Sequence, residues 1–193
     1  MFLFLNNNEC AIFIPKLARL KSLLSQQHIT LTIQRLANQL LESHTPFEQT
    51  VFIGIQPRGI FLSDRIVAEM KKEVPGANFQ YGKLDITFYR DDIRTELHVP
   101  NQTDIPFSIE GKKVVLIDDV LYTGRTIRAA MDALMDFGRP DKVELLVLIE
   151  RRYSRQLPIQ PDYTGKSIDS IVSQKVKVLW KERDGEDEVI LLD

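Results

Sequence analysis

Two adjacent carboxylates stand directly before a threonine- and glycine-containing turn in the segment Val114–Thr126, which reads VVLIDDVLYTGRT. The apolar start of this segment predicts a buried strand that delivers Asp118 and Asp119 to the carboxyl edge of a sheet, where open α/β sheets bind ligands. The turn at Thr123–Thr126 then begins a predicted helix, whose free N–H groups and dipole favour an anion. Gly124 would let the backbone approach a phosphate closely.

Carboxylates beside an anion site point to a particular class of ligand. A phosphate alone would be repelled by them. A phosphorylated sugar fits, because its vicinal hydroxyls donate to the carboxylates while its phosphate accepts from the turn. The alternative is that Asp118 and Asp119 cap the helix. Two acids at a buried strand end are costly without a ligand or ion, which favours the sugar phosphate.

Strands and helices are predicted to alternate along most of the chain. We expect helices over 29–43, 60–74 and 124–137, and strands over 50–55, 84–89, 113–117, 142–149, 175–180 and 189–192. This order predicts an α/β fold in three layers, a mainly parallel twisted sheet with helices on both faces. We expect residues 29–193 to form a single domain and residues 1–28 an N-terminal extension.

The composition excludes several classes of protein. The 193 residues carry a net charge of −2 and 44% are hydrophobic, which excludes a disordered chain and argues against wholesale nucleic-acid binding. Cys10 is the only cysteine, which excludes an intrachain disulfide and fits a reducing compartment. The N-terminal segment lacks the basic start of a secretory signal, and no run reaches the roughly 20 apolar residues of a membrane helix. We therefore expect a cytoplasmic protein with no membrane or DNA partner.

DDVLYTGRT resembles the phosphoribosyl-pyrophosphate (PRPP) signature of type I phosphoribosyltransferases. LDITFYRDD (84–92), MDALMDFGRP (131–140) and QLPIQPDYTGKSI (156–168) resemble the PyrR family of pyrimidine-operon attenuators with uracil phosphoribosyltransferase activity. The resemblance implies the type I fold with a β-rich arm or lid. It also implies transfer of phosphoribose from PRPP to uracil, giving UMP and pyrophosphate, with Mg²⁺ carried on PRPP or pyrophosphate, in a homodimer or larger assembly. No metal site formed by the protein alone is expected.

The resemblance assigns roles to individual residues. Asp118 and Asp119 would bind the ribose hydroxyls, and the turn that follows would hold the 5′-phosphate. GIQPRGI (54–60) matches the pyrophosphate loop, with Arg58 as a third catalytic residue. The residues placed on the substrates are Pro57, Arg58, Gly59, Arg90, Asp118, Asp119, Val120, Leu121, Tyr122, Thr123, Gly124, Arg125, Thr126, Ile149 and Arg151.

The implied reaction needs charge stabilisation rather than a protein nucleophile. Breaking the anomeric C–O bond builds positive charge on ribose and negative charge on pyrophosphate. Arg58 and Arg90 would add positive charge near the pyrophosphate. The alternatives are a surface role for Arg58 and a surface ion pair of Arg90 with Asp91 or Asp92. The long segment 89–107 is the candidate lid that excludes water.

Uracil would lie over the loop after the strand at 142–149. Here Glu150 and Arg152 stand where the resemblance implies the Asp and Gly of an Asp-Arg-Gly turn, and the loop is one residue longer. The alternative for Arg151, Arg152 and Arg155 is a solvated or subunit-contact cluster.

RNA binding, the family's other activity, needs clustered Lys and Arg. The helix at 29–43 holds only Arg35, so catalysis is the better supported activity. The alternatives are an RNA-binding regulator with little catalysis, and a phosphoribosyltransferase for hypoxanthine, guanine or orotate. His28, His44 and His98 show no ligand spacing, and we expect surface or loop positions for all three.

Overall fold

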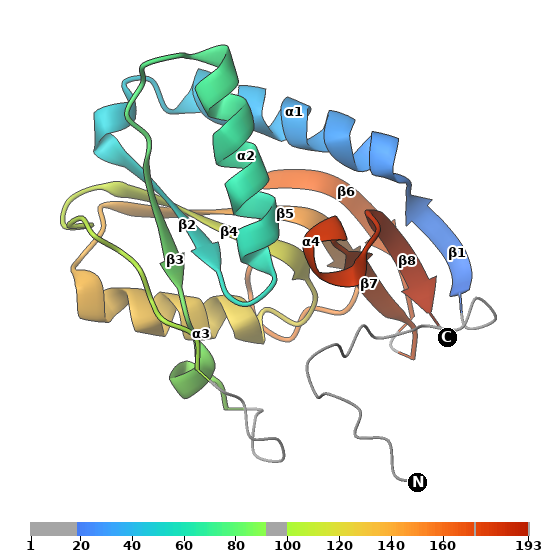
Figure 1. Ribbon diagram of the computed structural model, residues 1–193. Helices are drawn as coiled ribbons and strands as arrows, with labels where there is room; N and C mark the ends of the chain where they lie inside the picture. The colour runs from blue at the N-terminus through green and yellow to red at the C-terminus, as the bar shows by residue number, and fades with distance from the viewer. Residues whose placement is uncertain (1–18, 92–99, 172, 193) are drawn as a thin grey trace, which may run out of the picture. The chain divides into compact units, whose positions relative to one another are not determined.

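The computed structural model describes residues 19–91, 100–171 and 173–192 (Figure 1). The chain folds into two compact units, one formed by Thr30–Val172 and one by the two ends of the chain, up to Ile29 and from Ser173. No helix in the described part of the chain combines the length and the apolar character needed to cross a bilayer. The division into an extension and one domain stays a prediction, and residues 1–18 of that extension lie outside the description.

A five-stranded parallel sheet is the centre of the larger unit, in the order β3-β2-β4-β5-β6. The strands are β2 (Thr50–Ile55), β3 (Gln80–Leu84), β4 (Lys113–Leu121), β5 (Lys142–Arg152) and β6 (Tyr163–Asp169). Helix α2 (Gly59–Glu73) lies between β2 and β3 in the chain, and α3 (Arg125–Leu134) lies between β4 and β5. The predicted parallel α/β architecture is confirmed.

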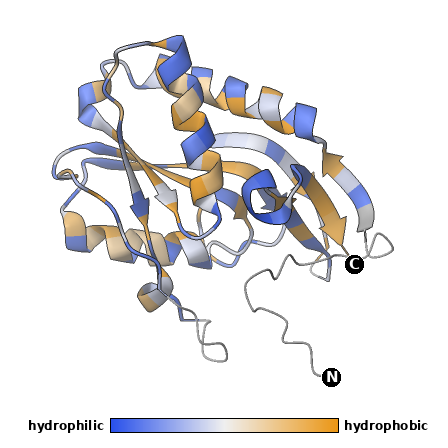
Figure 2. Cartoon of the chain, in the orientation of Figure 1, coloured by the Kyte–Doolittle hydropathy of each residue, from blue (hydrophilic) through white to orange (hydrophobic). Residues whose placement is uncertain are grey.

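One face of this sheet packs on α3. Val51 and Ile53 of β2 and Leu116 of β4 share a buried cluster with Ile127 and Ala130 of α3. In Figure 2, α3 alternates hydrophobic and hydrophilic bands, as a helix with one face on a sheet should.

Helices α1 (Gln26–Ser43) and α2 cover the opposite face. A Cβ on Gly54 of β2 would lie 2.1 Å from Oγ of Ser63 in α2, and one on Gly165 of β6 would lie 2.9 Å from Cγ2 of Thr32 in α1. Because both faces are covered, every residue of β2 is buried.

The smaller unit contains an antiparallel sheet in the order β1-β8-β7. Its strands are β1 (Arg19–Leu24), β7 (Lys175–Leu179) and β8 (Glu188–Leu192), and α4 (Lys181–Asp184) lies between β7 and β8 in the chain. The predicted late strands correspond to β7 and β8. Residues 19–24, expected in the extension, form β1.

The predicted strand over 84–89 is wrong. The strand β3 ends at Leu84, and Thr87–Tyr89 forms a 3₁₀ turn. The carboxylate of Asp85 accepts the Thr87 N–H at 2.6 Å, which gives the backbone a local partner in place of a strand neighbour. In the candidate lid, Asp104 pairs with Lys83 of β3, whereas residues 92–99 lie outside the described part, so the lid stays a prediction.

His44 lies in the loop after α1, one of the two kinds of position expected for it, but its side chain is not at the surface. It is only 3% exposed, because its ring lies against Phe52 of β2 and Tyr163 of β6. Its Nδ1 lies 3.3 Å from Oγ1 of Thr50, and its Nε2 lies 3.1 Å from the Tyr163 hydroxyl and 3.1 Å from Glu144 Oε2. His28 is exposed, and His98 lies outside the described residues.

Candidate active site

Asp118 and Asp119 lie near the carboxyl end of β4, 6% and 7% exposed. The Asp119 N–H donates to Asp118 Oδ1 at 2.9 Å. Burial, and then the neighbouring Asp119 charge, raise the pKa of Asp118 well above its ordinary value, while Arg90 and Arg58 act in the opposite direction. The capping alternative is not supported: Asp118 accepts from the Asp119 N–H and Asp119 accepts from Arg58, whereas the Arg125 N–H at the start of α3 donates to Thr123 Oγ1 at 3.4 Å. The end of β4 thus holds two adjacent buried carboxyl groups.

The loop after β2 reaches these carboxyls. Arg58 donates from Nε to Asp119 Oδ2 at 3.1 Å, and its side chain is 25% exposed, so a solvated surface role does not describe it. A Cβ on Gly59 would lie 2.6 Å from the Ile117 carbonyl oxygen and 3.0 Å from Asp118 Cα. Only glycine therefore lets this loop lie against β4. Pro57 is exposed beside it.

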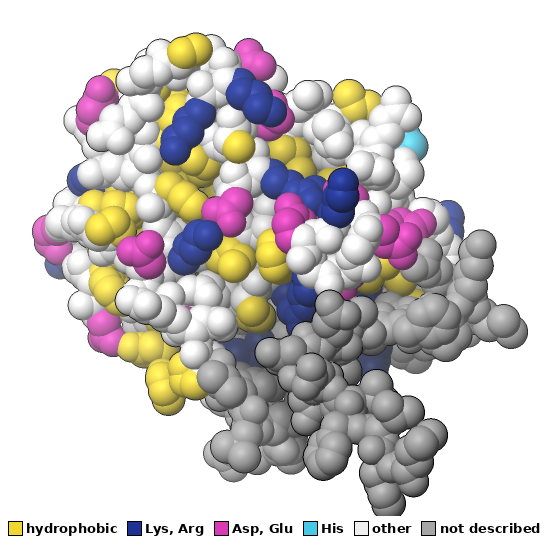
Figure 3. All heavy atoms as spheres, in the orientation of Figure 1, with side chains coloured by type: hydrophobic (Ala, Val, Ile, Leu, Met, Phe, Trp, Pro, Cys, Tyr) yellow, Lys and Arg dark blue, Asp and Glu magenta, His cyan; other side chains and the backbone are white. Residues whose placement is uncertain are grey.

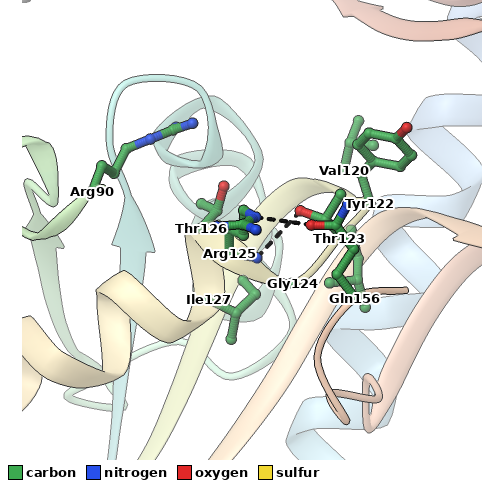
Figure 4. Close-up of a pocket in the computed structure, with 10 residues that line it drawn as sticks. Arg90, Val120, Tyr122, Thr123, Gly124, Arg125, Thr126, Ile127 and Gln156 are labelled. Atoms are coloured by element: carbon green, nitrogen blue, oxygen red, sulfur yellow. Dashed lines mark hydrogen bonds between the residues drawn. The ribbon is translucent and has the colours of Figure 1, made fainter. Parts of the chain in front are cut away.

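A cavity of about 310 Å³ is lined mostly by the residues that follow the carboxyl pair in the chain (Figure 4). Its lining starts at Val120, directly after Asp119, and includes the whole predicted turn. The lining residues are Arg90, Val120, Leu121, Tyr122, Thr123, Gly124, Arg125, Thr126, Ile127 and Gln156. Ile127 and Gln156 are not among the residues predicted from the sequence. Gln156 comes from the segment after β5, where no residue pattern marks it as part of this site.

The backbone of the turn has the shape that glycine permits. Gly124 has φ +93°, in the left-handed region, and a Cβ there would lie 3.2 Å from Cδ1 of Ile159. Arg125 donates from Nε to Gln156 Oε1 at 2.8 Å, and this bond is drawn in Figure 4. Arg125 also contacts Asp91 at 3.2 Å.

The predicted base-binding residues Ile149 and Arg151 lie in β5, outside the cavity lining. Ile149 is fully buried and pairs with Val120 of β4. Arg151 is 4% exposed, and its guanidinium lies 3.9 Å from the centre of the Tyr122 ring. It donates from Nε to Ser170 Oγ at 2.8 Å, and burial lowers its pKa. A solvated role does not fit Arg151.

No group of three or more His, Cys, Asp or Glu side chains suited to a metal ion occurs among the residues that the structure describes.

Known proteins resemble this chain over most of its length. A family model described as the phosphoribosyl transferase domain matches residues 19–183. The Bifunctional protein PyrR of Elusimicrobium minutum is 45% identical over 168 residues, 86% of this chain and 93% of that protein. The Bifunctional protein PyrR of a Picosynechococcus species is 45% identical over 171 residues, 88% of this chain and 96% of that protein.

Solved structures show the same fold at low identity. A hypoxanthine phosphoribosyltransferase from Staphylococcus aureus has a TM-score of 0.68 and 20% identity, covering 91% of this chain and 94% of that chain. An HGPRT-ase from Leishmania tarentolae, in complex with GMP, has a TM-score of 0.69 and 12% identity over 91% of this chain and 98% of that chain. The matches in sequence and structure confirm the expected resemblance: the chain belongs to the phosphoribosyltransferases and, among them, to the PyrR family of bifunctional proteins.

Proposed function

We infer that the chain transfers phosphoribose from PRPP to uracil, releasing pyrophosphate and forming UMP, and that it also acts as a pyrimidine-operon attenuator. The observation that carries the catalytic part is the placement of Asp118 and Asp119 directly before the cavity-lining turn at Gly124. The similarity to PyrR proteins over most of the chain supports uracil as the base.

The site holds the two ends of a ribose 5-phosphate. The carboxyl pair accepts hydrogen bonds from the 2′ and 3′ hydroxyls, which offset the unfavourable burial of two acids. The N–H groups and hydroxyls of Thr123–Thr126 donate to the 5′-phosphate, and Gly124 keeps the turn free of a side chain. The sugar is thus fixed at both ends while its anomeric carbon remains accessible.

The catalytic step separates charge, and the protein stabilises that separation. The buried carboxylate of Asp119 lies near the ribose, where positive charge develops as the anomeric bond breaks. Arg58 and Arg90 carry positive charge toward the pyrophosphate, and Mg²⁺ enters as part of the PRPP substrate. We propose, as the resemblance implies, that the base lies over the end of β5, in the region of Ile149 and Arg151.

Competing bases provide the decisive test of the reaction. The consumption of PRPP is measured with uracil, hypoxanthine, guanine and orotate in turn, with Mg²⁺ present. We expect turnover with uracil and formation of UMP. Activity with a purine or orotate and none with uracil would reverse the assignment.

Regulation requires an RNA-binding surface that carries Lys and Arg side chains. Arg35, the only basic residue of α1, donates to the carbonyl oxygens of Thr164 and Gly165 at 3.2 and 2.7 Å, so its guanidinium faces β6. On the face shown in Figure 3, basic side chains are interspersed with acidic ones. Filter binding to attenuator RNA, with and without UMP, tests this activity; tight binding that UMP strengthens is the expected result.

We also expect a homodimer or larger assembly that works in the cytoplasm. Four large apolar side chains of the 3₁₀ turn at Thr87–Tyr89 and of the α3 region are exposed and offer a surface for self-association: Phe88, Met131, Met135 and Phe137. Light scattering at micromolar protein concentration measures the assembly, and a monomer would contradict this expectation.

A further inference from the structure

The segment Arg155–Leu157 lies beside the cavity-lining turn and binds its backbone. Arg155 donates from a terminal guanidinium nitrogen to the Tyr122 carbonyl oxygen. The backbone N–H groups of Gln156 and Leu157 donate to the Thr123 carbonyl oxygen at 3.0 and 3.3 Å. Two consecutive carbonyl groups of the turn are therefore held by the same three residues.

Holding a carbonyl also orients the N–H of the same peptide unit. In a planar trans peptide the N–H points opposite to the C=O. The anchored carbonyls of Tyr122 and Thr123 therefore turn the N–H groups of Thr123 and Gly124 away from the segment Arg155–Leu157. These N–H groups are among the donors that the proposed function assigns to the 5′-phosphate.

Arg155 is itself held in place by Glu150. Its other terminal nitrogen lies 3.1 Å from Glu150 Oε1, and Ser167 Oγ donates to Glu150 Oε2 at 2.8 Å. Glu150 pairs in register with Leu121 of β4 and with Ser167 of β6. The side chains of Arg155 and Glu150 are 20% and 19% exposed, so their ion pair is partly shielded from water. The arginine is thus supported by strand β5 and its neighbour β6.

Glu150 is also a position where this chain departs from the resemblance, which implies aspartate in a loop one residue shorter. In the structure its longer side chain accepts from Arg155 and Ser167 together. The departure thus coincides with a contact that supports the turn.

We propose that Arg155 is a positioning residue for the 5′-phosphate of PRPP and UMP: supported by Glu150, it holds the Tyr122–Gly124 peptides with their N–H groups toward the phosphate. The inference rests on the proposed function, because it assigns the phosphate to this turn. It predicts that Arg155 affects binding of the phosphate end of the substrate and leaves the base end alone.

The test compares Arg155→Met, which removes both polar contacts at similar length, with Arg155→Lys, which keeps the charge. Arg139→Met is the control, because Arg139 is exposed and is not part of the cavity lining. Binding of ribose 5-phosphate is measured by calorimetry, and KM is measured separately for PRPP and for uracil. Thermal unfolding shows whether each variant is folded.

For Arg155→Met we expect weaker ribose 5-phosphate binding and a higher KM for PRPP, each by about 10- to 100-fold, the effect of losing a hydrogen bond to a charged group. KM for uracil should stay within about twofold, Arg155→Lys should recover part of the loss, and Arg139→Met should match the wild type.

Unchanged phosphate binding in folded Arg155→Met overturns the inference, and so does an equal rise in both KM values, which would mean general disruption. If Arg155→Met does not fold, Glu150→Ala is judged by the same criteria. A wild-type protein that neither binds ribose 5-phosphate nor consumes PRPP overturns the proposed function itself. The two failures are therefore distinguishable.

Discussion

Arg58 donates from Nε to Oδ2 of Asp119 across 3.1 Å, and this contact joins the loop after β2 to the end of β4. The proposed reaction places Asp119 on the ribose and Arg58 on the departing pyrophosphate. The two groups that stabilise opposite charges in the transition state are therefore already paired with each other. Such pairing holds both side chains near their working positions, so little reorganisation is needed when the substrate arrives.

Asp119→Asn tests the role of the carboxylate. The amide keeps the size of the side chain but removes its charge, so we expect kcat/KM for PRPP to fall about 10- to 100-fold, as for a lost charge-assisted hydrogen bond. The circular dichroism spectrum should stay native. Asp141→Asn, at an exposed position, is the control and should keep full activity. Near-normal turnover in Asp119→Asn would remove the carboxylate from ribose binding.

Asp118→Asn should make the protein more stable at neutral pH. The pKa of Asp118 is raised by burial and by Asp119, so the folded state holds its proton at pH values where the unfolded state has lost it. Below the ordinary pKa of 3.8 this group's contribution to the free energy of unfolding is fully present. As pH rises through the raised pKa of the folded state, that contribution is lost. Asparagine cannot ionise and avoids that loss.

The measurement for Asp118→Asn is the free energy of unfolding in urea at pH 7 and near pH 4. The gain over wild type should be present at pH 7 and shrink at the lower pH, while Asp141→Asn should differ little from wild type at both. A loss of stability at pH 7 would contradict the prediction. A gain in stability together with lost activity is typical of a site built for function.

Gly124→Ala and Gly111→Ala form a matched pair of substitutions. Both glycines have positive φ, +93° and +66°, but only Gly124 has near neighbours, whereas a Cβ on Gly111 would meet nothing within 4 Å. Each alanine should lower the free energy of unfolding by about 1–2 kcal/mol through backbone strain. Gly124→Ala alone should also raise KM for PRPP. An unchanged KM in that variant would separate the turn from the phosphate.

Much of the fold follows from local sequence signals. The strand predicted over 50–55 has the same bounds as β2, because its residues are continuously apolar or β-branched. The cavity-lining turn is likewise predicted from Gly124 and its neighbours. The local sequence patterns of these two elements are strong, and the tertiary structure favours the same conformations.

Elements that depend on distant partners are not predicted. The strand β6 contains Gly165, Lys166 and Ser167, which have weak strand propensity, and forms only by pairing with β5. The contact that Arg155 makes is also hidden in the sequence, because the backbone oxygen that it binds belongs to Tyr122, far away along the chain. Residue type alone does not identify a backbone partner, so neither feature could be predicted from the sequence.

His44 provides a buried group whose titration should affect stability. Burial lowers its pKa below 6.5, and the charges of Lys113 and Lys142 act in the same direction, whereas Glu144 opposes them. The Tyr163 hydroxyl, which donates to Glu144 Oε2 at 3.0 Å, completes the polar surroundings of the ring. The imidazole is therefore neutral in the folded protein at neutral pH.

Lowering the pH should destabilise the protein through His44. Between 6.5 and the lowered pKa the unfolded state binds a proton that the folded state does not, so the free energy of unfolding falls as pH falls through this window and is full above it. His44→Gln should flatten this part of the stability curve, measured by urea unfolding from pH 7.5 downward in steps of about 0.5. His28→Gln, at an exposed position, should follow the wild-type slope. Parallel curves for wild type and His44→Gln would show that another group causes the pH dependence.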